Sequence, residues 1–203
     1  MHGVACDSRH GGLEGGRCML ENLLELDGQL LLWIQDNLRA DWLTPLMRTV
    51  TTLGEFGMIW ILISFVLLCF KRTRKAGAAG IVGLLFSLLL NNVLLKNLVA
   101  RTRPYEVIAG LQLLGAKATD LSFPSGHAGS SFACAVAVCR MLPEKMFRWR
   151  WLLIAFAVLM SISRLYIGIH YPSDVIAGIV FGTFCGFAAA WTVRAVLKKL
   201  SEK

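Results

Sequence analysis

The sequence has few charged residues: Asp, Glu, Lys and Arg make up 17% of its 203 residues, whereas 56% are apolar. Its mean hydropathy is +0.60. A soluble domain of ordinary composition carries about 25% charged residues, so this composition argues against a water-soluble globular protein. We therefore expect an integral membrane protein.

The six cysteines do not form a metal or redox motif, because none of them stands in a CxxC pair. No group of Cys, His, Asp or Glu has the spacing of metal ligands, so we expect no metal site and no cofactor. Four of the cysteines lie in apolar runs, where Cys behaves as a small apolar residue. The other two, Cys6 and Cys18, would pair only in an oxidising compartment, and the sequence leaves this open.

Two further patterns are missing. The basic residues form short clusters between apolar runs and no stripe with interleaved aromatic side chains, so we expect no nucleic-acid partner. Residues 1–19 lack an apolar stretch after a basic start, and we therefore expect no cleavable signal peptide.

The first leucine-rich segment, residues 19–34, is interrupted by carboxylates that would be costly to bury in hydrocarbon. We expect an amphipathic helix at the membrane interface, followed by a second short helix from about residue 42 to residue 52. Trp33 and Trp42 would lie at the level of the lipid headgroups. The interrupting carboxylates are Glu21, Glu25 and Asp27.

Five later apolar runs approach the length needed to cross a bilayer core of roughly 30 Å. The expected fold class is therefore all-α: an integral membrane helical bundle of about five transmembrane helices with N-terminal interfacial amphipathic helices. Small residues in the third and fifth runs, including a glycine at every fourth position from 178 to 186, predict close helix packing inside the bundle. The runs cover residues 56–70, 76–95, 127–142, 151–166 and 175–193.

The predicted organisation has three parts: a polar tail (1–19), interfacial helices (20–55) and a transmembrane domain (56–203). Basic residues cluster after the first run, after the third run and at the C-terminus. The positive-inside rule then predicts a cytoplasmic C-terminus and places the 96–125 loop and the 164–174 turn together on the outer side. The clustered cations are Lys71, Arg72, Arg74, Lys75, Arg140, Lys145, Arg148, Arg150, Arg194, Lys198, Lys199 and Lys203.

Polar residues that interrupt the apolar background fall into three groups. The first, Lys96, Arg101 and Arg103, follows the second run, where snorkelling to the interface explains cations equally well. The second is the turn from Ser122 to Ala128, which enters a helix. The N-terminus of that helix suits an anion, although a simple N-cap by Ser125 explains the serine as well.

The third group begins with Arg164 at the end of the fourth run and continues with His170 and Asp174 at the start of the fifth. Asp174 lies four residues after His170 and can orient one imidazole nitrogen, so that the other presents a lone pair. Capping of the last helix by Asp174 is the alternative. Cations, two histidines, a carboxylate and an anion-binding helix end at one face form the inventory that phosphoryl transfer requires.

The spacings within the groups are specific. Lys96 with Arg103-Pro104, then Pro124-Ser125-Gly126-His127, then Ser163-Arg164 with His170 and Asp174 resemble the three signature motifs of the type 2 phosphatidic acid phosphatase superfamily. The apolar runs resemble the membrane branch of that family, and short bacterial undecaprenyl-diphosphate phosphatases in particular. The 56–203 region would then be a transmembrane phosphatase domain.

The resemblance implies a role for each matching residue. His170 would attack phosphorus and become phosphorylated, while Asp174 orients it. His127 would protonate the leaving oxygen and later activate water. Arg101 lies outside the family pattern, and we assign it only an attraction to lipid headgroups. The implied phosphate-binding residues are Lys96, Arg103, Ser125, Gly126 and Arg164.

The expected function is that of a metal-independent lipid phosphatase, with membrane lipids as partners. The leading substrate is undecaprenyl diphosphate at the outer face of a bacterial plasma membrane. Phosphatidylglycerol phosphate or phosphatidate is the close alternative, and a non-catalytic lipid-binding or scrambling protein is a third. The resemblance of the motifs to soluble vanadium haloperoxidases conflicts with the five apolar runs. Oligomeric state and tail preference are left open.

Overall fold

The computed structural model describes the backbone of residues 13–202 and the side chains of residues 22–202. Within this part of the chain all regular secondary structure is helical, which confirms the all-α prediction. The question whether Cys6 and Cys18 pair lies outside the described side chains, and so does most of the expected polar tail.

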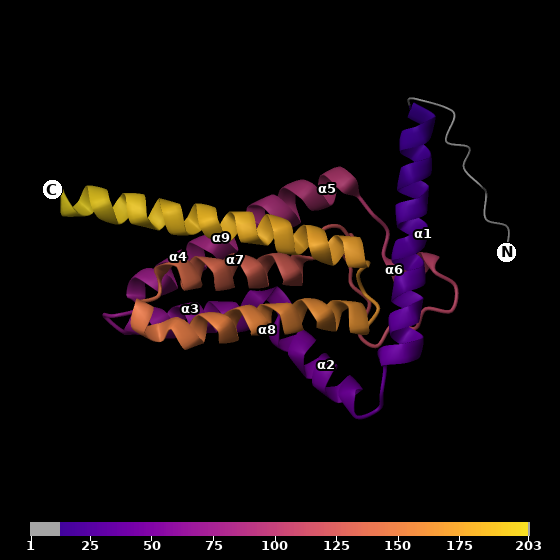
Figure 1. The fold of residues 1–203 in the computed structure, drawn as a ribbon, viewed down its shortest axis with the longest axis horizontal. Helices are drawn as coiled ribbons and strands as arrows, with labels where there is room; N and C mark the ends of the chain where they lie inside the picture. Colours follow the sequence, from indigo (N-terminus) through magenta and orange to yellow (C-terminus); the bar gives the residue numbers. More distant parts are fainter. Residues whose placement is uncertain (1–12, 203) are drawn as a thin grey trace.

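Helix α1 (Leu13–Leu38) lies crosswise at one end of the molecule and extends beyond both ends of the predicted segment (Figure 1). One face of α1, with Leu31, Ile34 and Asp27, is buried against the bundle, whereas Leu26 and Leu30 are exposed, and its amphipathic, interfacial character stays a prediction. Helix α2 (Leu43–Leu53) matches the second predicted helix. The chain then bends by 53° into the following helices.

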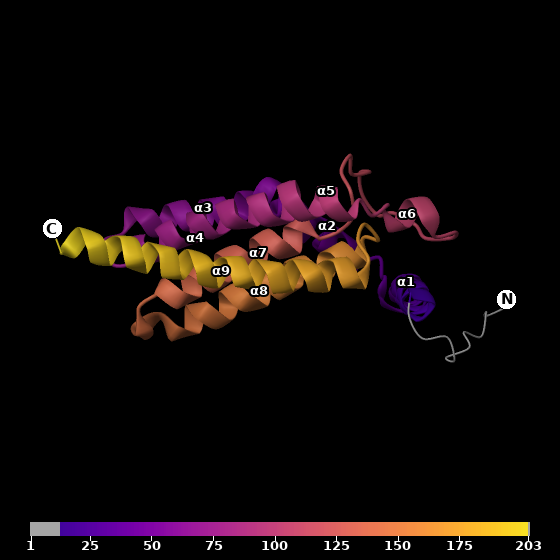
Figure 2. The same ribbon diagram turned by 90° about the horizontal axis from the view of Figure 1, so that it is seen from above.

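Five long helices run side by side at the positions of the five predicted spans (Figures 1 and 2). Short elements connect them or extend them: η1 (Glu55–Gly57), the π-helical η2 (Leu88–Leu95), α5 (Lys96–Val99), α6 (Pro104–Val107) and η3 (Glu144–Met146). The long helices are α3 (Met58–Cys69), α4 (Arg74–Ser87), α7 (Gly126–Met141), α8 (Phe147–Tyr166) and α9 (Pro172–Ser201).

Three helical stretches of the described residues are long and apolar enough to cross a membrane: Arg74–Val107, Glu144–Tyr166 and Pro172–Ser201. The bent pair Leu43–Leu53 and Glu55–Cys69 would make a fourth. Helix α7 has only 16 residues and is therefore about 24 Å long, shorter than a typical hydrocarbon core. The expected number of five spans stays a prediction.

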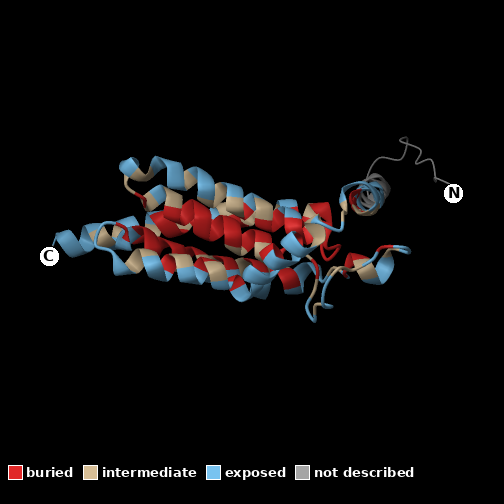
Figure 3. Ribbon diagram, turned by 90° about the horizontal axis from the view of Figure 1, so that it is seen from below, coloured by how far each residue is buried: buried red, intermediate tan, exposed pale blue. Residues whose placement is uncertain are grey.

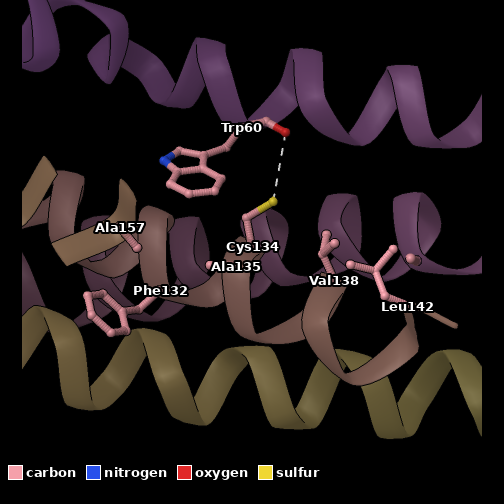
Figure 4. Packing of buried hydrophobic residues seen from close by; sticks show 8 residues of the cluster. Trp60, Phe132, Cys134, Ala135, Val138, Leu142 and Ala157 are labelled. Carbon is pink, nitrogen blue, oxygen red and sulfur yellow. Dashed lines mark hydrogen bonds between the residues drawn. The ribbon is translucent and has the colours of Figure 1, made fainter. Parts of the chain in front are cut away.

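Helix α7 is the centre of the bundle and is buried along most of its length (Figure 3). Its small side chains let α3, α4, α8 and α9 approach it. On one side Trp60 of α3 donates an indole hydrogen bond of 2.8 Å to Ser131, and Cys134 donates to the carbonyl of Trp60 (Figure 4). The buried Cys134 thus behaves as the small core residue expected from the sequence.

The glycine row of α9 packs directly against α7. A Cβ atom at Gly182 would lie 2.3 Å from the carbonyl oxygen of Gly129, and one at Gly178 would lie 2.6 Å from that of Ser125. The prediction of close packing is therefore confirmed. The prediction that α9 lies inside the bundle is wrong, because its other face is exposed and carries the large apolar residues Ile176, Val180, Phe184, Phe187 and Trp191.

The two ends of the bundle differ in composition. The α3–α4 and α7–α8 connections, which carry basic clusters, lie at the same end as the C-terminus (Figure 1). At the opposite end, α6, the 108–125 segment and the α8–α9 turn meet beside α1 (Figure 2). The predicted meeting of the 96–125 loop and the 164–174 turn at one end is therefore confirmed.

Candidate active site

His170 lies in the turn between α8 and α9 and is only 2% exposed. Arg103 Nη1 lies 3.1 Å from its Nε2 and 3.5 Å from its Nδ1, and Nε2 is the acceptor in the tautomer whose Nδ1–H faces the carboxylate of Asp174. The proton then resides on Nδ1, which lies 3.6 Å from Asp174 Oδ2. Burial lowers the pKa of His170 to about 3, opposed by Asp174 and aided by Arg103. The imidazole is therefore neutral at physiological pH, as a nucleophile requires.

Asp174 is fully buried in the first turn of α9. Its Oδ2 accepts hydrogen bonds from the backbone N–H of Tyr171 at 3.0 Å and from Ser122 Oγ at 2.5 Å. It therefore caps α9 and faces His170 at the same time, so the two alternatives left open by the sequence are both realised.

A cavity of about 1300 Å³ brings the predicted cations together. Lys96 at the start of α5, Arg103 before α6 and Arg164 in the last turn of α8 all line it, with His170. Arg164 donates to Thr51 Oγ1 at 2.5 Å, but its buried Nε has no partner among the described residues. A buried unpaired donor is costly, and an oxygen of a phosphate group would satisfy it.

His127, in the first turn of α7, lines the same cavity as His170. Its Nε2 lies 3.2 Å from the backbone oxygen of Thr51, which only accepts, so Nε2 carries a proton in this arrangement. The two histidines predicted to act together therefore face one space, His127 from the start of α7 and His170 from the α8–α9 turn.

Ser125 and Gly126, which are neighbours in the sequence, have different positions relative to the cavity. Gly126 lines the cavity, and a Cβ atom there would lie 2.9 Å from Asn92 Oδ1. Ser125 is fully buried behind it, accepts a 3.5 Å hydrogen bond from the N–H of Ala128, and is not among the cavity-lining residues. In this structure Ser125 is an N-cap, and its predicted contact with phosphate is not made at the cavity wall.

Sequence reasoning missed Asp120, whose carboxylate binds both Lys96 and Arg103 at the cavity. Burial alone would raise the pKa of Asp120, but the two cations outweigh it and hold the pKa below its usual value. Thr51 was also missed, and Ser122 was included in the second polar group without a role. The sequence contains no local signal for Asp120 or Thr51, because their segments reach the site only through the tertiary fold.

Arg101 is not the free headgroup-binding cation that we expected. It is largely buried and donates to Asp174 Oδ1 at 2.8 Å and to Asp27 Oδ2 at 2.8 Å. The expectation fails because the chain turns at Ala100, which has a positive φ of 49°. This turn directs the segment that follows toward α1 and α9 instead of lipid.

Part of the cavity has an apolar wall, although Arg48, Glu55, Asn92 and Lys117 also line the cavity. Side chains from η1, α3, α4 and η2 form this wall, and several of them are exposed at the protein surface, Phe56 by 94%. One cavity therefore joins a cationic inner part to an apolar outer part, as a lipid phosphate requires. The apolar residues are Phe56, Ile61, Ile81, Leu84, Leu85 and Leu88.

Comparisons with known proteins agree with this geometry. Residues 77–198 match the PAP2 superfamily. The chain is 40% identical over 138 residues to an undecaprenyl-diphosphatase from Sulfolobus acidocaldarius, an alignment covering 66% of this chain and 65% of that protein. It is 29% identical to a lipid A 4'-phosphatase from Bacteroides thetaiotaomicron over 91% of this chain and 83% of that protein.

A solved structure has the same fold. The PAP2-type phosphatidylglycerolphosphate phosphatase from Bacillus subtilis superposes with a TM-score of 0.69 at 25% identity, covering 88% of this chain and 87% of that one. The family match covers more than half of the chain, and it includes the segments that carry all three motifs. This chain therefore belongs to the PAP2 superfamily and is a membrane lipid phosphatase.

Proposed function

We propose that the protein hydrolyses undecaprenyl diphosphate to undecaprenyl phosphate through a phosphohistidine at His170. One observation carries the proposal: a single cavity is lined by His170, by the three cations of the motifs and by an apolar wall that is exposed at the surface. The name of the Sulfolobus relative supports an isoprenoid diphosphate as the substrate.

In the first step His170 Nε2 attacks the terminal phosphorus, and the bond from that phosphorus to the bridging oxygen breaks. His127 gives its proton to the leaving undecaprenyl phosphate. Phosphorylation makes His170 cationic, and Asp174 beside Nδ1–H stabilises that charge.

In the second step His127, now neutral, takes a proton from water, and the resulting hydroxide attacks the same phosphorus. The P–N bond breaks, inorganic phosphate leaves, and His170 regains its lone pair. Lys96, Arg103 and Arg164 bind the phosphoryl oxygens in both steps, which requires Lys96 and Arg103 to exchange Asp120 for phosphate. Arg103 Nη1 must also turn from His170 Nε2 to a phosphoryl oxygen, because Nε2 has only one lone pair with which to attack. The Gly126 backbone completes the phosphate site, and Ser125 supports it as the cap of α7.

We further infer that the protein spans a bacterial plasma membrane five times, with the active site on the extracytoplasmic face and the C-terminus in the cytoplasm. The basic clusters at the end opposite the site support this orientation, because positive loops stay in the cytoplasm. Helix α1 would then lie along the outer interface, and residues 20–55 would form the interfacial region.

Phosphatidylglycerol phosphate and other glycerolipid phosphates are the second candidate substrates. The likeness to the Bacillus subtilis phosphatase supports them, and the cations would bind any terminal phosphate. A lipid A phosphate is a related candidate through the Bacteroides relative. The phosphate site would bind all of these lipids equally well. Contacts with the lipid tail and with the leaving group must therefore determine which lipid is the substrate.

The test is phosphate release by purified protein in detergent micelles with EDTA, comparing undecaprenyl diphosphate, phosphatidylglycerol phosphate and phosphatidate. We expect the diphosphate to give the highest kcat/KM, EDTA to leave the rate unchanged, and His170→Ala to abolish release. A strong preference for a glycerolipid would replace the substrate. Equal slow release by wild type and His170→Ala would support a non-catalytic lipid-binding protein.

A further inference from the structure

Arg101 connects two carboxylates that come from opposite ends of the chain. Its Nη1 donates to Asp174 Oδ1 of α9 at 2.8 Å, and its Nη2 donates to Asp27 Oδ2 of α1 at 2.8 Å. The side chains of Arg101, Asp27 and Asp174 are 14%, 9% and 0% exposed. The guanidinium also lies over the ring of Tyr171, 3.7 Å from its centre. These are paired, desolvated charges, which differ from ordinary surface ion pairs.

The position of Arg101 determines which oxygen of Asp174 faces the nucleophile. Because Arg101 occupies Oδ1, the other oxygen, Oδ2, is the one that faces His170 Nδ1 and accepts from Ser122. Without Arg101, rotation of the carboxylate would cost less, and a buried negative charge would lose its main cationic partner. The orientation of His170 therefore depends on a residue that does not touch it.

Asp27 supports the same turn from the other side. Its Oδ1 accepts the backbone N–H of Ser173 at 3.0 Å, and its Oδ2 accepts from the hydroxyl of Ser173 as well as from Arg101. Ser173 is in the first turn of α9, where backbone N–H groups have no partner within the helix. A side chain of α1 thus caps the helix that carries Asp174.

We propose that Arg101 and Asp27 are positioning residues for phosphoryl transfer, and that α1 is through them a part of the catalytic scaffold. The inference rests on the proposed role of His170 as nucleophile. Arg101 fixes the carboxylate that orients His170, and Asp27 fixes Arg101 and the start of α9. Neither residue touches the substrate.

The experiment measures kcat and KM for phosphate release by Arg101→Gln, Arg101→Lys and Asp27→Asn. We expect Arg101→Gln to lower kcat by about 10- to 100-fold, the range seen for partners that orient a functional histidine, with KM nearly unchanged. Arg101→Lys should recover part of the loss, since lysine keeps the charge but cannot bind both carboxylates as a fork. Asp27→Asn should show a smaller loss of kcat.

The matched control is Arg39→Gln. Arg39 also joins the end of α1 to the α8 side of the site, donating to the backbone oxygen of Tyr166 at 2.9 Å and to Gln35 Oε1 at 3.2 Å, and neither of these hydrogen bonds reaches Asp174. If α1 acted only by packing, Arg39→Gln would lower kcat as much as Arg101→Gln does. We expect its kcat to stay within about twofold of wild type, as is usual for a change away from the site.

A double-variant cycle separates positioning from folding. If Arg101 acts through Asp174, adding Arg101→Gln to Asp174→Asn should lower kcat little further, whereas independent effects multiply. The proposal would be overturned if the loss of kcat in the double variant equalled the product of the two single losses, or if Arg101→Gln left kcat unchanged. Should Arg101→Gln fail to fold, Arg101→Lys and Asp27→Asn carry the same test. If instead the wild-type protein forms no phosphohistidine, the proposed function is wrong. The positioning proposal then fails because His170 is not the nucleophile, whatever the Arg101 variants show.

Discussion

The two histidines of the cavity are held in different ways. His170 is buried, and its two nitrogens face Arg103, Ser122 and Asp174. His127 is partly exposed, and one backbone oxygen, that of Thr51, is the hydrogen-bond partner found for it. A nucleophile needs one fixed direction, whereas a proton shuttle must meet a leaving group in one step and water in the next. The contrast therefore agrees with the roles that the motifs imply.

The two histidines also differ in how many other residues fix their orientation. Behind His170, Asp174 is bound by Arg101, and Arg101 by Asp27 of α1. For His127, the backbone of α2 at the bend that leads to α3 is the hydrogen-bond partner among the described residues. The orientation of the nucleophile thus depends on four separate segments of the chain, and that of the proton shuttle on two.

The largest expected effect is at the rigid histidine. Replacing His170 by alanine removes the attacking lone pair, so kcat should fall by roughly 10⁴- to 10⁶-fold, as when a catalytic nucleophile is deleted. Rapid-quench experiments with radiolabelled substrate should find label on wild-type protein and none on the variant. Label that persisted in the variant would place the nucleophile elsewhere.

Replacing the loosely held histidine should cost less. His127→Gln removes the proton donor and the base, each of which is worth about 10²- to 10⁴-fold. Because the second step depends on the base, we expect the labelled phosphoenzyme to decay more slowly than in wild type. A variant that loses label at the wild-type rate would show that another group activates water.

Asp120→Asn should change binding and leave the chemistry alone. The carboxylate competes with phosphate for Lys96 and Arg103, and removing a half-exposed charge near them is worth on the order of 1 kcal/mol, or about fivefold. Vanadate, as a mimic of the transferred phosphoryl group, should therefore inhibit the variant at a lower concentration, with kcat changed little. Weaker inhibition by vanadate would mean that Asp120 orders the cations instead of competing.

The smallest expected effect is that of mild acid on the nucleophile. Since the pKa of His170 is lowered to about 3, its lone pair is available above that pH and is lost only as the pH falls through it. Protonation of His170 should therefore cause no acid limb near pH 6.5, the ordinary value for histidine. The measurement is kcat/KM against pH for wild type and His127→Gln. A limb near 6.5 that remains in His127→Gln would contradict the buried, neutral state of His170.

Sequence reasoning identified most of the cavity, because its residues carry chemistry in recognisable spacings. Lys96, Arg103, His127 and Arg164 line one space with His170, as the motifs suggested. It misjudged Arg101 and placed Ser125 at the wall instead of behind it. Both errors concern the direction in which a side chain points, and this depends on how the backbone turns at a helix end.

Composition and spacing alone determined that the chain is helical and apolar, where its long helices lie, and which end carries the site. These follow from local properties, since hydropathy and helical periodicity are present in any stretch of the chain. Only the tertiary structure decided that His170 presents Nε2, that Asp120 occupies two cations, and that Asp27 of α1 reaches Asp174 through Arg101. The contacts of Arg101 join residues 73 and 74 positions apart, and that of Arg103 with His170 joins residues 67 positions apart, so they depend on how whole helices pack and not on any local pattern.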